Sequence, residues 1–356
     1  MPEDIYRELR KKIDELSFGF PSTDSEIELR ILKKLFTKED AETWLLLTHQ
    51  LETPEEFVGR TGRNLETAAI HLHDMAERGL IYRLKRGDIV KYATIGFMHG
   101  IWEFQLPTMD KEFAAMSAEY KNEKPFRETM TRAAAGFLRT IPVQQSLDAT
   151  RHVAAFEDAS EFLKKAKKIT VADCICRKNQ KLIDKGCEKP MEVCFMMGSM
   201  GQYYLDRGMA REVGIDEALK ILAEAQEAGL VTQPATSQNP GGMCNCCGDC
   251  CFVLQTLSQH PKPAEVVFSN YFAAVDQETC IGCEACLDRC QMAAIHMNED
   301  DRSEIDLDRC IGCGLCVITC PTESLSMVPK PEDQRRTPPP DSRGQMELIQ
   351  KLREPF

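Results

Sequence analysis

The stretch CIGCEACLDRC at residues 280–290 decides the fold of the C-terminal part, and it returns as CIGCGLCVITCP at residues 310–321. Each copy spaces four cysteines as C-x2-C-x2-C-x3-C. Three thiolates at positions i, i+3 and i+6 of a tight loop can surround three irons of one cube. Glycine inside each loop lets the backbone turn close to the sulfur atoms. The two copies therefore predict a pair of [4Fe–4S] clusters.

The residues from Val275 to Val328 resemble the two-cluster bacterial ferredoxins. The resemblance implies one cluster on Cys280, Cys283, Cys286 and Cys320, and a second on Cys310, Cys313, Cys316 and Cys290. The chain departs from the family pattern at Gln291, where proline is usual, while Pro321 is kept. Zinc knuckles are the alternative, but they lack the repeated spacing. Clusters ligated fully by cysteine leave no iron open to a substrate, so this part indicates one-electron transfer.

The 17 cysteines of this 356-residue chain all lie between Cys174 and Cys320. No secretory signal pattern is visible at the start, and the most apolar stretch, Val193 to Leu205, is too short to cross a bilayer. We therefore expect a cytoplasmic protein without membrane insertion. In a reducing compartment, clustered cysteines indicate metal or redox cofactors rather than disulfides.

A second group of cysteines centres on CNCCGDCC at residues 244–251. Within it Cys244, Cys247 and Cys250 repeat the C-x2-C-x2-C spacing, which predicts another cluster site. The remaining ligands of this middle module are expected from Cys246, Cys251, Cys174, Cys176, Cys187 and Cys194. One or two [4Fe–4S] clusters fit these nine cysteines, and the spacing does not say which cysteine binds which cluster.

Three other interpretations of the middle cysteines remain open. One is a closed structural zinc site on Cys174, Cys176, Cys187 and Cys194. Another follows from CCG at residues 246–248, which resembles an element of heterodisulfide-reductase-type proteins. That family has a further upstream cysteine and a second CCG, and this chain has no cysteine from Phe195 to Met243. The third is a reactive thiol pair.

Two segments of the middle module have clear secondary-structure patterns. The apolar run Ile169 to Asp173 predicts a buried strand, and Asp216 to Gly229 predicts an amphipathic helix capped by Asp216. Basic residues, Arg177 among them, are frequent around this module. The C-terminal module is acidic instead, with a hairpin expected between its two cysteine runs at Glu299 to Asp308. Such a hairpin is a solvated loop or a docking site for a basic redox partner.

The first 173 residues contain no cysteine. Helices are predicted at Ile27 to Leu35, at Asp40 to Leu51, after the Thr53 cap and from Asn64 to Gly79; a hairpin follows, with its turn at residues 85–88. This order resembles a winged helix-turn-helix domain over roughly residues 25–96. The helix that would enter DNA carries Glu66, Asp74 and Glu77 against Arg78 alone, so protein docking is favoured over DNA binding.

The complete order resembles a group of iron–sulfur proteins of anaerobes, built from a winged helix, a cysteine-rich middle and a two-cluster ferredoxin. The expected fold is α+β and multidomain. The predicted domains are a helical plus winged-helix domain at 1–145, an α/β cluster-binding module at 146–265, a ferredoxin domain at 266–330, and a Pro-rich linker with a short helix at 331–356.

We expect an electron-transfer subunit of a larger anaerobic oxidoreductase complex rather than an enzyme on its own. It would relay single electrons between the cofactor of a protein redox partner and a low-potential carrier. Flavin, NAD and ATP are not indicated, because no Gly-rich dinucleotide motif and no P-loop is present. The alternative is a redox-sensing transcription regulator that uses the winged helix to bind DNA.

Overall fold

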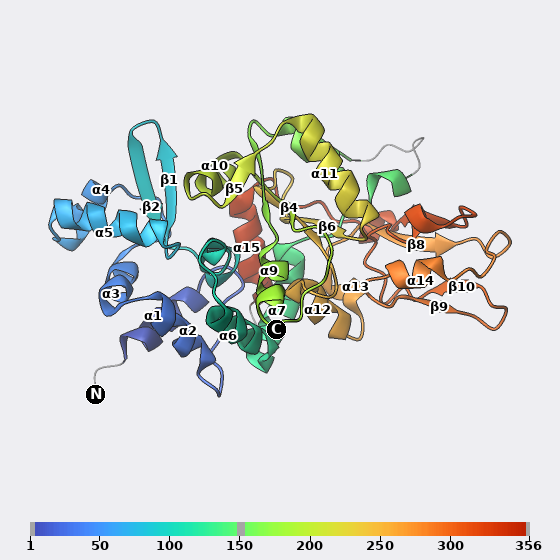
Figure 1. Cartoon of the computed structure of the whole chain (residues 1–356), viewed down its shortest axis with the longest axis horizontal. Coiled ribbons are helices and arrows are strands. Elements are labelled where there is room, and N and C mark those ends of the chain that lie inside the picture. Colours follow the sequence, from blue (N-terminus) through green and yellow to red (C-terminus); the bar gives the residue numbers. More distant parts are fainter. Residues whose placement is uncertain (1–3, 148–153, 354–356) are drawn as a thin grey trace. The chain divides into compact units, whose positions relative to one another are not determined.

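The computed structural model describes residues 4–147 and 154–353 (Figure 1). The chain folds into two compact units of mixed α/β structure. One unit comprises Met1–Thr129, Lys178–Lys185 and Tyr203–Met209, and the other comprises Met130–Arg177, Gly186–Gln202 and Ala210–Phe356. The first unit contains no cysteine, so all candidate cluster ligands lie in the second unit.

The first unit is mainly helical and includes one β-hairpin. Its elements are α1 (Ile5–Asp14), α2 (Ile27–Leu35), α3 (Lys38–Leu46), α4 (Pro54–Thr61), α5 (Leu65–Glu77), β1 (Tyr82–Arg86), β2 (Ile89–Ala93), η1 (Phe97–Ile101), η2 (Glu103–Gln105) and α6 (Lys111–Asn122). Strands β1 and β2 pair antiparallel, as the sequence predicts. Aromatic rings fill part of the core, where Phe20 packs against Phe97 and Tyr120 with ring centroids 4.3 and 4.9 Å away.

Side-chain caps set the helix boundaries of this unit. The predicted caps are confirmed at Thr53, which accepts a hydrogen bond from Glu56 N, and at Asn64, which accepts one from Thr67 N. The prediction for Asp40 to Leu51 is wrong at both ends, because α3 spans Lys38–Leu46. Thr37 and Asp40 form a capping box that starts the helix two residues earlier than expected.

The later elements form the second unit, although α7, α9 and α10 each have residues in both units. They are α7 (Lys124–Phe137), η3 (Gln144–Ser146), η4 (Ala155–Glu157), α8 (Ala159–Lys165), β3 (Ile169–Asp173), α9 (Ile175–Leu182), β4 (Glu192–Met197), α10 (Gly198–Asp206), β5 (Ala210–Glu212), α11 (Ile215–Glu227), β6 (Val231–Pro234), β7 (Gly242–Cys246), α12 (Phe252–Gln259), α13 (Pro263–Val266), β8 (Tyr271–Val275), α14 (Ala285–Arg289), β9 (Ile295–Met297), β10 (Ser303–Ile305), η5 (Val317–Thr319), β11 (Leu325–Pro329), η6 (Glu332–Gln334) and α15 (Ser342–Arg353).

A five-stranded antiparallel sheet organises the middle of this unit, with strand order β5-β3-β4-β7-β6. The buried strand predicted at Ile169 to Asp173 is confirmed as β3. One face of the sheet packs against α8 and α11 through Phe195 of β4, Met243 of β7 and Leu222 of α11. Because side chains alternate along a strand, the neighbours of Phe195 and Met243 point to the opposite face.

The start of α11 differs from the prediction. Asp216 lies inside the first turn, and Gly214 occupies the cap position with an extended backbone. The carboxylates of Asp216 and Glu217 still lie where the positive end of the helix dipole favours them. Acidic residues at the second position of a helix therefore resemble a cap when only the sequence is read.

Two small antiparallel sheets form the C-terminal part, one from β8 and β11 and the other from β9 and β10. The hairpin expected between the two cysteine runs is confirmed as β9–β10. Apolar residues of both sheets, such as Ala273, Ile295 and Met327, share one buried cluster with several cysteines. Among the described residues, no helix has the length and apolar character needed to cross a membrane.

Candidate iron–sulfur centres

The second cysteine run lines a pocket. Its walls include all four cysteines that the sequence assigns to one cluster, Cys290, Cys310, Cys313 and Cys316, together with Gly312 and Gly314. Both glycines have a positive φ, of 71° and 75°, which bends the loop around the sulfur atoms. Burial raises the pKa of Cys313 to about 12, so this thiol ionises readily only when a cation binds it.

Backbone amides point at the sulfur atoms of this pocket. Ala273 N donates to Cys310 Sγ at 3.4 Å, and Ala294 N donates to Cys290 Sγ at 3.2 Å. Hydrogen bonds of this kind orient thiolate ligands and adjust the redox potential of a bound cluster. The pocket therefore fits a cysteine-ligated [4Fe–4S] cluster in both ligand set and polarity.

The first cysteine run forms a similar loop nearer the surface. Gly282 has a φ of 68°, and Ser303 Oγ lies 3.1 Å from Cys286 Sγ. Cys283 is exposed, whereas Cys280 and Cys286 are buried. Cys320 follows η5 and packs against the same apolar cluster as Cys286. Cys280, Cys283, Cys286 and Cys320 are the ligands that the ferredoxin resemblance implies for the other cluster, and Cys283 places one edge of this set at the surface.

Residues 273–327 match the family model of the 4Fe-4S dicluster domain. The C-terminal segment is thus a ferredoxin-type domain, hereafter the dicluster domain, and [4Fe–4S] clusters are its cofactors. Neither a curated protein nor a solved structure matches the chain. The other nine cysteines lie outside the matched segment, so their interpretation depends on the geometry of the sites themselves.

Six of those nine cysteines form a closed set, here called the six-thiol set. Each thiol in it has two thiol neighbours from the same set, and following the neighbours leads from Cys174 to Cys176, Cys251, Cys246, Cys244, Cys194 and back to Cys174. All are free thiols. The adjacent thiols lower the pKa of Cys174 and raise the pKa values of Cys176 and Cys194. Such a set holds several thiolates together only when bound metal ions supply positive charge.

The sheet supplies three members of the six-thiol set. Cys194 of β4 lies next to Phe195, and Cys244 of β7 lies next to Met243, so both point away from the core face. Cys246 is two residues beyond Cys244 and shares its face. Between them, Asn245 is fully buried, and its side-chain amide donates to Val193 O at 2.9 Å. Strand alternation therefore explains the C-x-C spacing.

Helix starts supply the other three members. Cys174 precedes α9, Cys176 lies in its first turn, and Cys251 occupies the cap position of α12. The backbone N–H groups of Arg177 and Leu254 lie beside the thiols of Cys174 and Cys251, and each lowers the pKa of its neighbouring thiol. Both helices thus direct backbone N–H groups and positive dipole ends toward sulfur, which favours the thiolate form.

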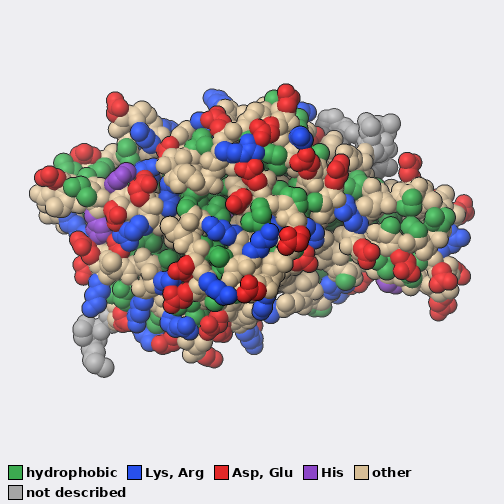
Figure 2. Space-filling model, in the orientation of Figure 1, with side chains coloured by type: hydrophobic (Ala, Val, Ile, Leu, Met, Phe, Trp, Pro, Cys, Tyr) green, Lys and Arg blue, Asp and Glu red, His purple; other side chains and the backbone are tan. Residues whose placement is uncertain are grey.

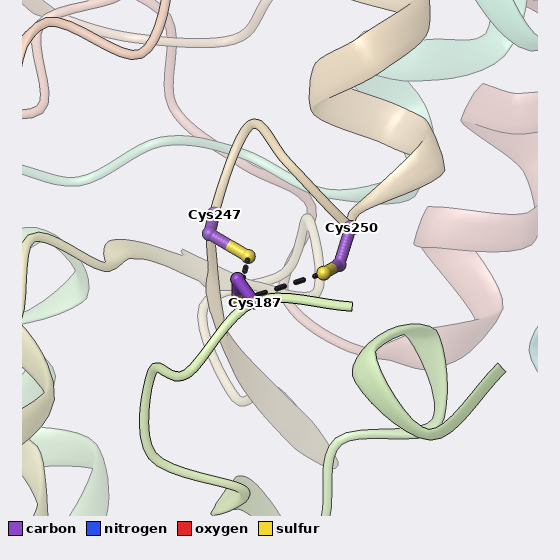
Figure 3. A group of neighbouring side chains, drawn as sticks. All are labelled: Cys187, Cys247 and Cys250. Carbon is purple, nitrogen blue, oxygen red and sulfur yellow. Dashed lines mark hydrogen bonds between the residues drawn. The ribbon is translucent and has the colours of Figure 1, made fainter. Parts of the chain in front are cut away.

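The remaining three cysteines form a separate group, here called the three-thiol set (Figure 3). The Sγ atom of Cys187 lies 3.7 Å from that of Cys247 and 3.6 Å from that of Cys250. The three side chains converge from two segments, the loop between α9 and β4 and the turn between β7 and α12 (Figure 3). The predicted triplet of Cys244, Cys247 and Cys250 is therefore divided between the two sets.

The four cysteines of the alternative zinc site are likewise divided. Cys174, Cys176 and Cys194 belong to the six-thiol set, and Cys187 belongs to the three-thiol set. The chain order hides this division, because Cys187 lies between Cys176 and Cys194 in sequence.

Arg177 lies close to the thiols of the middle module, and the sequence analysis gave it no role of its own. It is fully buried, and its guanidinium donates to Pro190 O at 2.7 Å and Asn245 O at 2.9 Å. Among the described residues no carboxylate pairs with it. Burial lowers the pKa of Arg177, but the nearby thiols, led by those of Cys174 and Cys247, raise it above its ordinary value. A buried guanidinium beside several thiols is suited to balance the negative charge that these thiols would carry as metal-bound thiolates.

Proposed function

We propose that the chain is a multi-cluster electron-transfer protein, with two [4Fe–4S] clusters in the dicluster domain and an iron–sulfur cluster on the six-thiol set. The observation that carries this proposal is that all the candidate thiol sites belong to one compact unit. The two cysteine sets of the dicluster domain and the six-thiol set all belong to it. A bound [4Fe–4S] cluster accepts and releases one electron without changing its cysteine ligands.

The protein contributes ligand position, shielding and charge to this function. Cys316 lies near Cys286 as well as near its own set, so the two sites of the dicluster domain adjoin. Gln291, next to Cys290, accepts a hydrogen bond from Gly248 N, next to Cys247. Short routes through bonds thus connect the dicluster domain with the CNCCGDCC segment. Arg177 supplies the positive charge that stabilises thiolates in the buried middle module.

Electrons would enter or leave at the first cysteine run. Cys283 is exposed there, and Ile281 beside it is 67% exposed. An exposed apolar side chain beside a cluster ligand is suited to contact with a protein redox partner. We propose that this partner belongs to a larger oxidoreductase complex in an anaerobic cell, with the relay operating in the cytoplasm.

We propose that the helices and hairpin of the first unit form a winged helix and that this domain binds a partner protein. Two arginines near α5 and β1 engage acidic neighbours: Arg78, directly after α5, bonds both carboxylate oxygens of Asp40, and Arg83 of β1 bonds Glu77. These contacts reduce the positive charge that a DNA phosphate backbone would need. They disfavour the alternative, a DNA-binding redox regulator.

The test is the iron content of anaerobically purified full-length protein. About twelve irons per chain, with matching acid-labile sulfide, are expected from three cubes. Cys280→Ser should damage the dicluster domain and leave the signal of the middle cluster in electron paramagnetic resonance spectra. The contradicting result would be eight irons in the wild-type protein, all of them lost when cysteines of residues 280–320 are substituted. The dicluster domain would then hold all the iron, and the six-thiol set would hold no cluster.

A further inference from the structure

The three-thiol set has the dimensions of a site for one metal ion. Two thiolates bound at about 2.3 Å to one tetrahedral Zn2+ lie about 3.8 Å apart. The sulfur of Cys187 lies 3.7 Å from that of Cys247 and 3.6 Å from that of Cys250, and all three sulfurs lie within 4.8 Å of one another. Thiolates on different irons of a cube are held farther apart, because each iron lies between its thiolate and the cube centre. The spacing therefore favours a single ion.

Backbone amides support all three sulfur atoms. The backbone N–H groups of Lys189, Cys250 and Cys187 lie beside the thiols of Cys187, Cys247 and Cys250, respectively. Backbone N–H groups that face thiolates help to orient them as metal ligands. The three side chains converge on one another (Figure 3).

The turn between Cys247 and Cys250 is also held from outside. Gly248 N donates to Gln291 Oε1 at 2.7 Å, and Asp249 pairs with Lys189 at 2.9 Å. This ion pair joins Asp249, which lies between the two turn cysteines, to Lys189, which lies two positions after Cys187. Both segments of the site are thereby fixed to each other without any metal, so the thiols are preorganised for binding.

The charge of the surroundings fits a zinc–thiolate centre. Three thiolates around one Zn2+ carry one net negative charge, and the buried guanidinium of Arg177 lies near Cys187 and Cys247. Among the described residues, no further His, Cys, Asp or Glu atom completes the group as a fourth ligand. Zinc accepts three protein ligands and one exchangeable ligand, such as water or a thiol.

We propose that Cys187, Cys247 and Cys250 bind one Zn2+ through three thiolates, with the fourth position open to an exogenous ligand. This site is separate from the six-thiol set. Because Zn2+ has no redox chemistry, it would not carry electrons itself. The zinc fixes the loop between α9 and β4 to the turn between β7 and α12. Because Cys246 of the six-thiol set precedes Cys247 directly, the ion also holds the ligands of the neighbouring site in place.

The experiment measures zinc, iron and copper in full-length protein purified anaerobically. About one zinc per chain is expected in the wild-type protein. Cys187→Ala should lose this zinc and keep the iron content and the cluster signals of the wild type. Cys176→Ala is the matched control, since it removes one buried thiol of the six-thiol set. It should lower the iron content and keep the zinc.

Spectroscopy decides the matter if Cys187→Ala does not fold. The zinc X-ray absorption spectrum of the wild-type protein should then show three sulfur neighbours at about 2.3 Å. A wild-type protein without zinc, copper in place of zinc, or a Cys187→Ala variant that keeps zinc and loses iron would each overturn the proposal. Iron on the six-thiol set is measured separately by the Cys176→Ala variant, so a failure here leaves the electron-transfer function standing.

Discussion

The side-chain oxygen of Gln291 accepts a hydrogen bond from the backbone N–H of Gly248 at 2.7 Å. Gln291 Nε2 also donates to Gly229 O at 3.3 Å. Proline, which is usual at this place in ferredoxins, has no side-chain group able to make either bond. A Cβ atom at residue 248 would come within 3.0 Å of the Gln291 oxygen, so glycine permits the close approach. The departure from the ferredoxin pattern therefore has a structural role: it ties the dicluster domain to the three-thiol set.

The first prediction concerns this contact. Gln291→Ala should lower the free energy of unfolding by about 1 kcal/mol, because the Gly248 N–H loses its acceptor. Anaerobic urea denaturation followed by circular dichroism measures the change. Gln291→Glu keeps an acceptor oxygen and is the control. Equal losses in both variants would show that the bond to Gly248 does not contribute.

The second prediction concerns Arg177. Arg177→Met should lower the midpoint potential of the cluster that we propose on the six-thiol set, since a positive charge stabilises the reduced state. A shift on the order of tens of millivolts is expected from a partly screened charge. Redox titration followed by electron paramagnetic resonance measures it, with the dicluster signals as an internal reference.

Arg177→Lys is the matched variant for that titration, because it keeps the positive charge and changes the hydrogen bonds to Pro190 O and Asn245 O. Its potential should remain closer to that of the wild type. If both variants shift the potential equally, the hydrogen bonds rather than the charge of Arg177 set the potential.

The dicluster domain was predictable because each run places three cysteines within seven residues of one loop. The grouping of the middle cysteines was not, because they come from segments as far apart as Cys174 and Cys251. The i, i+3, i+6 rule also assumes one continuous loop. Here β7 continues to Cys246, so strand alternation directs Cys244 and Cys246, and only Cys247 and Cys250 belong to the turn.

The boundaries of helices were predictable where a capping residue stands alone, as at Asn64. The boundaries were not predictable where two residues able to cap a helix, such as Thr37 and Asp40, lie close together. Thr37 starts α3 in place of the expected Asp40, whose carboxylate instead accepts from Thr37 N at 2.8 Å. Buried counter-charges were also beyond sequence reasoning, because the isolation of Arg177 from carboxylates appears only in three dimensions.

The third prediction concerns DNA. Duplex DNA should bind weakly, without sequence preference, and more weakly still as salt increases. The reason is that α5 presents Ile70, which is 66% exposed, while Arg78 is held by Asp40 and Asp74. Fluorescence anisotropy with unrelated duplexes at low and physiological salt measures this. A salt-resistant complex with one sequence would make the transcription regulator the better interpretation.

The fourth prediction concerns the acidic hairpin β9–β10, where Figure 2 shows acidic side chains gathered. Its turn lies against the first cysteine run, because a Cβ at Gly282 would overlap the carbonyl oxygen of Asp301. The exposed carboxylates of Glu299, Asp300 and Asp301 therefore surround the proposed electron entry point at Cys283. Such a cluster of charge attracts a basic partner over distances comparable with the Debye length.

Neutralising the three acids as Glu299→Gln, Asp300→Asn and Asp301→Asn should slow electron transfer to a basic c-type cytochrome about tenfold at low salt. Asparagine at residue 301 tolerates the positive φ of 55° found there, so the turn should keep its shape. Stopped-flow absorbance measures the rate under anaerobic conditions. The difference between variant and wild type should shrink as salt is added, since screening removes the attraction in both.

A matched variant changes the same charge elsewhere, through Glu42→Gln, Glu55→Gln and Glu66→Gln on exposed helix surfaces of the first unit. Its rate should equal that of the wild type if the local field at the hairpin guides the partner. If instead both triple variants slow the reaction equally, net charge alone governs the encounter, and the hairpin has no special part in docking. If neither slows it, electrons leave the protein at a site other than the first cysteine run.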